Sequence, residues 1–253
     1  MKYSLLYLTL AFLFLSCQNT QVAQLDADKI VNNAITVSGK SKLTYAELQY
    51  TFRNFTYSSD GKCDHYVYTR TAKKNDSVLK DVYNTNGELK RFINNQEQKL
   101  ADSTAFNYSE SINSVNYFIQ LPLRLNDQAV IKSYLGIDTI KGKPYHNIKV
   151  RFSEENGGTD FQDVYYYWFG KRDFKLDYLA YSFTVNGGGI RFREAYNERF
   201  IEGVRFVDYK NYKPVDAKTT LDNISEKFNK GELELLSKIE NDITSLNLKE
   251  NKC

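Results

Sequence analysis

The chain has 253 residues, and its 34 lysine and arginine residues against 31 aspartate and glutamate residues leave a formal net charge of +3. This near balance argues against a dedicated nucleic-acid-binding protein, because such proteins carry a clustered basic surplus. The 20 tyrosines and 16 phenylalanines are typical of strands with one buried and one partly wet face, and they exclude a disordered chain. Two histidines and three cysteines offer little for metal or triad chemistry, so we predict no metal and no cofactor and lean against an enzyme.

The first seventeen residues predict a lipoprotein signal peptide. An almost unbroken apolar run from Leu5 to Leu15 follows Lys2. It is too short to span a membrane, which needs ~20 apolar residues, and has the length of a signal-peptide core. The tetrapeptide from Phe14 to Cys17 resembles a lipobox, which implies cleavage after residue 16 and lipidation of the Cys17 sulfur. Several acyl chains would anchor the protein stably to a membrane.

Residues 17–25 carry little pattern up to Leu25, and we interpret them as a lipidated tether. The residue after Cys17 is Gln18, whereas an aspartate there would resemble an inner-membrane retention signal. No acidic cluster of the kind typical of surface export follows. We therefore predict an outer-membrane lipoprotein that faces the periplasm in preference to the cell surface.

Residues 26–248 read as a single domain, and residues 249–253 as a tail. Asp26 or Asp28 can cap a first helix that stops at Gly39. Strand patterns then follow at 45–57, 63–71, 79–84 and 89–94, with turn signals at residues 60–61 and 86–87. No linker, repeat or low-complexity tract interrupts the chain.

A helical stripe breaks the strand rhythm in the middle of the chain. Tyr108, Ile112, Val115 and Ile119 recur at helical spacing, and Pro122 ends the pattern. We favour the interpretation that the segment 102–125 packs on the sheet as core. The alternative is a movable flap over a cavity.

Strand patterns resume at residues 130–140, 145–152, 161–169, 174–185, 190–196 and 200–212. A C-terminal helix is expected from Thr219 or Thr220, with a second half after Gly231. Its inward residues would be Leu221, Ile224, Phe228, Leu236, Ile239, Ile243 and Leu246. The predicted fold class is α+β and mainly β: a curved antiparallel sheet, a half-barrel of about 10–11 strands, with N-terminal, middle and C-terminal helices packed on it.

Several stretches resemble known families. The hairpin from Ile140 to Val150 resembles a recurrent hairpin of the LolA/LolB-like lipoprotein carriers, whose half-barrels enclose an apolar cavity. Residues 177–182, 187–197 and 208–214 resemble an uncharacterised family of Bacteroidota-type lipoproteins. The resemblance to that family extends over nearly all of the mature chain. The first resemblance implies the fold and a lipid-like ligand, and the second, which carries no known activity, implies only the class of protein and its cellular location.

Charged residues within the aromatic strands are the candidate ligand-binding residues. Asp163 shares a face of its strand with aromatic residues that include Tyr165 and Tyr167, and Arg191 and Arg193 lie on the opposite face from Glu194. The set is Asp163, Tyr165, Tyr167, Asp177, Tyr181, Arg191, Arg193, Glu194, Tyr196 and Asp208. Such charges either form structural cross-strand pairs, which we favour, or line a cavity that receives a ligand head group.

Motifs for catalysis are absent or incomplete. Gly39-Lys40-Ser41 is short of a phosphate loop and ends a helix, so we interpret it as a helix cap. Cys63, Asp64 and His65 offer three metal-ligand types, but adjacent strand residues point to opposite faces, so the three cannot easily reach one metal. No nucleophile elbow occurs. Cys63 and Cys253 either pair in an oxidising compartment or remain free thiols.

Three functions are therefore carried forward. The first is a lipid-anchored envelope protein that binds an apolar or amphipathic ligand. The second is a non-enzymatic scaffold of an outer-membrane complex, with an envelope protein as partner. The third and least favoured is an envelope hydrolase that uses Asp163 and Glu194.

Overall fold

The computed structural model describes residues 19–155, 161–184 and 187–250, and the predicted signal peptide and Cys17 lie outside them. Within these ranges, fourteen strands form two seven-stranded antiparallel sheets. Sheet A has the order β14 (Asp242–Leu248), β1 (Ala46–Phe52), β2 (Phe55–Gly61), β3 (Tyr66–Lys74), β4 (Ser77–Asn84), β5 (Leu89–Ile93) and β6 (Gln96–Gln98). Sheet B has the order β13 (Leu233–Ile239), β12 (Val204–Pro214), β11 (Gly189–Ile201), β10 (Leu176–Phe183), β9 (Val164–Gly170), β8 (Lys143–Phe152) and β7 (Val130–Ile140).

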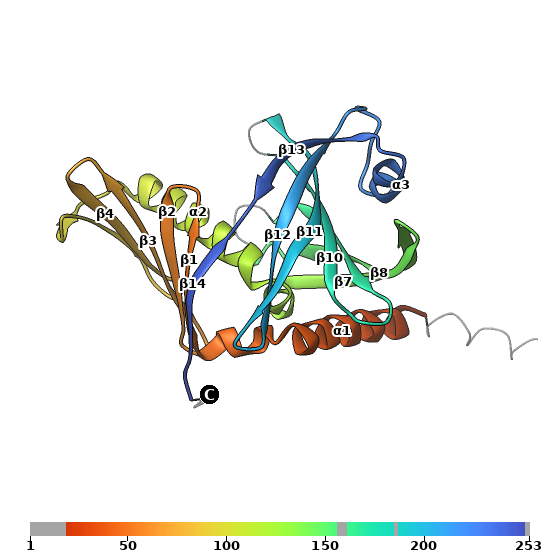
Figure 1. Cartoon of the computed structure of the whole chain (residues 1–253), viewed down its shortest axis with the longest axis horizontal. Coiled ribbons are helices and arrows are strands. Elements are labelled where there is room, and N and C mark those ends of the chain that lie inside the picture. The colour runs from red at the N-terminus through yellow and green to blue at the C-terminus, as the bar shows by residue number, and fades with distance from the viewer. Residues whose placement is uncertain (1–18, 156–160, 185–186, 251–253) are drawn as a thin grey trace, which may run out of the picture.

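The predicted mainly-β class with open, curved antiparallel sheets is confirmed, although the strands divide between two sheets. Sheet A lies at one end of the molecule and sheet B at the other (Figure 1). One long predicted strand, residues 45–57, is a hairpin of β1 and β2. The turn between them places Arg53 at a φ of 55°. Arginine is not a residue that usually marks such a turn, so the sequence did not reveal the break.

Helix α1 (Asn19–Ser38) covers the inner face of sheet B and begins earlier than the predicted cap at Asp26 or Asp28. Ala27, Val31 and Ala34 are fully buried on it, against strand residues that include Tyr167 and Leu179. The 3-10 helix η1 (Lys40–Tyr45) then leads into sheet A. Gly39, between the two helices, has a φ of 63°, and an added Cβ would lie 2.1 Å from the Gly203 carbonyl oxygen. Only glycine fits there, which agrees with a helix cap.

Helix α2 (Asp102–Gln120) is the predicted middle helix and lies between the two sheets (Figure 1). Ile112 and Ile119 of the predicted stripe are buried, and Pro122 precedes the 3-10 helix η2 (Leu123–Asn126). The segment therefore packs as part of the core, as the favoured interpretation predicts.

The C-terminal prediction is wrong in its second half. Helix α3 (Ile224–Asn229) buries Ile224 and Phe228 as expected, but it ends before Gly231. The chain then forms β13 on the edge of sheet B and β14 on the edge of sheet A. Both are edge strands with mostly exposed side chains, so pairing with β12 and β1 outweighs the weak helical spacing.

Sheet B is covered on both faces, which accounts for the aromatic surplus of the composition. Tyr167 and Phe169 face α1, while Tyr166 and Trp168 face the opposite side and belong to the cluster that includes Phe228 of α3. Trp168 Nε1 donates a hydrogen bond of 2.8 Å to Asp138 Oδ2.

Candidate ligand-binding cavity

A cavity of about 480 Å³ lies between helix α2 and the inner face of sheet B. Its volume is within the range of ~300–1,000 Å³ that is usual for small-molecule sites. Its apolar wall includes Phe118, Tyr165, Tyr181, Phe206, Val207 and Ile239. The cavity therefore has enough apolar surface to hold a hydrocarbon chain or a ring.

Helix α2 forms one side of the cavity because its other side is fixed to sheet A. Tyr50 Oη donates a hydrogen bond of 3.0 Å to Asn116 Oδ1, and Gln120 Nε2 donates one of 3.0 Å to Ser59 Oγ. The opposite face of the helix presents Ser114 and Phe118 to the cavity. The polar bonds thus orient the helix and keep its mixed face toward sheet B.

Arg193 of strand β11 is a buried cation in the cavity wall, with 8% of its surface exposed. Its Nη2 donates a hydrogen bond of 2.9 Å to Tyr181 Oη, and its guanidinium lies 3.9 Å from the Phe118 ring centre. The Nε atom is buried and has no hydrogen-bond partner. Asn211, its direct cross-strand partner on β12, also lines the cavity, and its Oδ1 atom is likewise buried and unpaired.

Lys40 is a second buried cation in the wall, with 3% of its surface exposed. Its Nζ donates a hydrogen bond of 2.6 Å to the Ile119 carbonyl oxygen and lies 4.0 Å from the Phe206 ring centre. Burial lowers the pKa of Lys40 well below its usual value, and the nearby charges of Arg205 and Arg199 lower it further.

Five of the ten candidate residues line the cavity: Asp163, Tyr165, Tyr181, Arg191 and Arg193. The alternation along β11 places Arg191 and Arg193 there and turns Glu194 to the other face. Lys40, Arg53, Phe118 and Arg205 also line the cavity, although sequence reasoning did not select them.

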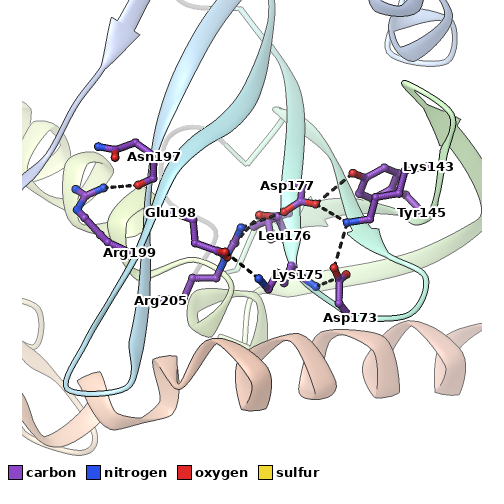
Figure 2. Close-up of polar contacts among 10 residues, drawn as sticks. All are labelled: Lys143, Tyr145, Asp173, Lys175, Leu176, Asp177, Asn197, Glu198, Arg199 and Arg205. Carbon is purple, nitrogen blue, oxygen red and sulfur yellow. Dashed lines mark hydrogen bonds and ion pairs between the residues drawn. The ribbon is translucent and has the colours of Figure 1, made fainter.

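The other three carboxylates among the candidates form structural ion pairs outside the cavity lining. Asp177 pairs with Lys143 at 3.0 Å and with Arg205 at 3.0 Å (Figure 2). Asp208 pairs with Arg199 at 3.1 Å. Glu194 pairs with Lys141 and Lys210 and accepts a hydrogen bond of 3.1 Å from Tyr212 Oη. Burial raises the Glu194 pKa, but the two lysines and the Tyr212 hydrogen bond hold it below its usual value.

The remaining two tyrosines also lie outside the lining. Tyr167 is fully buried in the core, and its hydroxyl is 3.2 Å from the Tyr117 hydroxyl. Burial raises the Tyr167 pKa well above its usual value. Tyr196 Oη donates a hydrogen bond of 2.6 Å to Glu240 at the protein surface.

Three further observations bear on the predicted chemistry. Cys63 is disulfide-bonded, and the other cysteines of the sequence, Cys17 and Cys253, lie outside the described residues. No group of histidine, cysteine, aspartate and glutamate residues in the described part of the chain could hold a metal ion. None of the helices within the described ranges has both the length and the apolar character needed to cross a membrane.

Two solved structures share the fold over most of the chain. A DUF1329 family protein from Desulfovibrio piger has a TM-score of 0.51 at 9% identity, covering 90% of this chain and 95% of that protein. A LolA superfamily protein from Nitrosomonas europaea has a TM-score of 0.50 at 11% identity, covering 88% of this chain and 94% of that protein. The fold is therefore LolA-like, as the sequence resemblance implies. No curated protein matches the chain in sequence. The model of a family of unknown function, DUF6503, matches residues 4–241, and the chain belongs to this family.

Proposed function

We propose that the protein is a cell-envelope lipoprotein that binds an amphipathic, lipid-like molecule in the cavity between helix α2 and sheet B. The observation that carries this proposal is the cavity itself. About 480 Å³ of space, with an aromatic and aliphatic wall that includes Phe118 and Ile239, lies within a LolA-like fold. A wall of this kind excludes water from the apolar part of a ligand and lets a few polar groups orient its head.

The proposed location rests on the leader sequence. The apolar run and the lipobox at Cys17 support export and lipid anchoring, and Gln18 supports the outer membrane over the inner membrane. We expect the domain to face the periplasm. Its partners would then be the membrane, through lipidated Cys17, and the bound ligand.

The two other functions receive less support. A scaffold needs no internal cavity, so the space beside Phe118 has no role in that function. A hydrolase that uses Asp163 and Glu194 as a pair is disfavoured because Asp163 lines the cavity, whereas Glu194 lies outside the lining and pairs with Lys141 and Lys210.

Binding can be tested with the full-length lipoprotein held in amphipol, so that no free micelles compete. The neutral dye N-phenyl-1-naphthylamine should fluoresce on entering the cavity and be displaced by hexadecanoate. Ser114 is exposed on α2 and lines the cavity, so Ser114→Trp should fill part of the space and weaken dye binding at least tenfold. Ser103→Trp, at an exposed position of the same helix outside the lining, is the matched control and should bind as the wild type does.

Mass spectrometry of the gently purified protein provides an independent measurement. We expect a co-purified amphiphile in the wild type and less of it in Ser114→Trp. Equal dye binding by wild type and Ser114→Trp, together with no extracted lipid from either, would refute the proposal.

A further inference from the structure

The buried arginines differ in whether they form an ion pair with a carboxylate of the described chain. Among the described residues, five arginines that are buried or half-buried each form an ion pair with a carboxylate: Arg70, Arg91, Arg124, Arg199 and Arg205. Two other arginines of the described chain are buried or half-buried, Arg191 and Arg193, and neither forms an ion pair with a described carboxylate. Both line the cavity. The rest of the fold neutralises such charges, so this exception requires an explanation.

Arg193 provides the strongest part of that explanation. Its guanidinium has five N–H donors. Within the described chain, one hydrogen bond uses them, from Nη2 to Tyr181 Oη. A buried charge without a counter-ion is strongly unfavourable, and buried polar atoms normally have hydrogen-bond partners.

Lys40 extends the same positive region. Its ammonium has three N–H donors and makes one hydrogen bond, to the Ile119 carbonyl oxygen. It forms no ion pair with a carboxylate of the described chain. Arg205, which also lines the cavity, differs because Asp177 and Glu198 neutralise it (Figure 2).

The lining therefore holds more positive than negative charge. Among the lining residues that the structure describes, Asp163 is the one carboxylate, against Lys40, Arg193, Arg191 and the exposed Arg53. Aromatic residues border these cations: Arg193 lies over Phe118, and Arg191 lies 4.9 Å from the Phe183 ring centre. A carboxylate or phosphate can accept hydrogen bonds from a guanidinium and an ammonium while an attached chain contacts the rings.

We infer that the ligand is an anionic amphiphile whose carboxylate or phosphate head group binds Arg193 and Lys40 inside the cavity, while its apolar part lies against Phe118, Tyr181 and Ile239. This assignment rests on the proposed function and narrows its ligand class. It distinguishes this cavity from one that selects a ligand by apolar contact alone.

The test compares two ligands that share one chain and differ in charge. Hexadecanoate and hexadecan-1-ol displace the neutral dye from the full-length protein in amphipol. We expect hexadecanoate to bind at least tenfold more tightly, which corresponds to about 1.4 kcal/mol. Arg193→Met should remove most of this preference and change the affinity for hexadecan-1-ol less than twofold.

Further variants separate charge from fold. Arg193→Lys retains a cation and should keep most of the preference. Lys40→Met removes the second cation and should also reduce the preference, which gives a test if Arg193→Met does not fold. Arg151→Met, at an exposed position of β8 outside the lining, is the control and should match the wild type.

The outcomes distinguish the inference from the proposed function. Equal binding of the acid and the alcohol to the wild type would overturn the anionic head group and leave the binding cavity in place. Failure of the dye and of both ligands to bind would overturn the proposed function itself. Inorganic phosphate is the third probe and should compete at least a hundredfold more weakly than hexadecanoate. Equal potency would mean that the site takes a small free anion, and the amphiphile assignment would be wrong.

Discussion

The buried charge triad of sheet A provides a sharp test of how the fold is held together. Asp81 of β4 is fully buried and lies between two arginines on the neighbouring strands. Arg70 contacts Asp81 Oδ2 through Nη2 at 2.7 Å and Nε at 3.1 Å. Arg91 contacts Oδ1 through Nε at 2.6 Å and Oδ2 through Nη2 at 3.0 Å. Both arginines also lie beside the Tyr108 ring of α2, so the triad connects the helix to the sheet.

The substitution Asp81→Asn removes the charge and preserves the shape. Breaking one partner of a buried ion pair destabilises a protein by about 3–5 kcal/mol, because the remaining charge stays buried. The Arg91 side chain is 13% exposed, so water partly compensates it. We therefore expect the lower end of the range, about 3 kcal/mol. The matched control is Glu97→Gln, whose pair with Lys90 is 3.5 Å long and more than half exposed on both sides. Exposed pairs contribute at most about 1 kcal/mol.

Urea unfolding followed by circular dichroism measures both variants against the wild type, with the disulfide kept oxidised. A loss of about 3 kcal/mol with an m-value of roughly 2–3 kcal/mol/M lowers the midpoint by about 1–1.5 M. Glu97→Gln should change the midpoint by less than half that amount. If Asp81→Asn and Glu97→Gln have equal midpoints, the triad contributes no more than a surface pair, and the reasoning from burial fails.

Three further predictions concern the core, the cavity and the disulfide. Leu179→Ala should lower the free energy of unfolding by about 3 kcal/mol, because Leu179 is fully buried against α1; a loss below about 1 kcal/mol in urea unfolding would contradict this packing. Because Lys40 has a lowered pKa in the folded state, with Arg205 and Arg199 as the facing charges, the unfolded chain binds more protons between that pKa and 10.5. Stability should rise with pH in this window by up to about 1.4 kcal/mol per unit, and Lys40→Met should reduce that slope; an unchanged slope would refute the prediction. Cys63 is disulfide-bonded, and lipidation of the Cys17 sulfur would leave Cys253 as its partner, so non-reducing peptide mapping should recover a Cys63–Cys253 peptide and not a Cys63–Cys17 one.

The sequence predicted elements that carry a strong local signal. Helix α2 was recognisable because Ile112 and Ile119 recur at helical spacing and Pro122 ends the run. The C-terminal strands were not, because β13 and β14 bury few side chains and β14 owes its conformation to β1, which is far away in the chain. Where burial is slight, hydrophobic spacing does not distinguish a helix from an edge strand.

The candidate site shows the same division. Strand alternation placed Arg191 and Arg193 on one face and Glu194 on the other. Lys40 could not be found in this way. Its burial depends on the first residue of η1 meeting two distant segments: the last turn of α2, where the Ile119 carbonyl accepts its hydrogen bond, and Phe206 of β12. Such meetings of distant segments leave no local pattern.

The passage from β13 to β14 connects the two sheets through only two residues, Glu240 and Asn241. Both backbone polar groups of Asn241 are hydrogen-bonded. Its N–H donates a hydrogen bond of 3.1 Å to Asp208 Oδ1, and its carbonyl accepts one from Arg199. Asn241 and Ile239 also belong to the cavity wall. The same short segment therefore connects the two sheets and forms part of the cavity wall. If a ligand of the proposed class moved the sheets apart, it would have to strain the hydrogen bonds that Asn241 makes with Asp208 and Arg199.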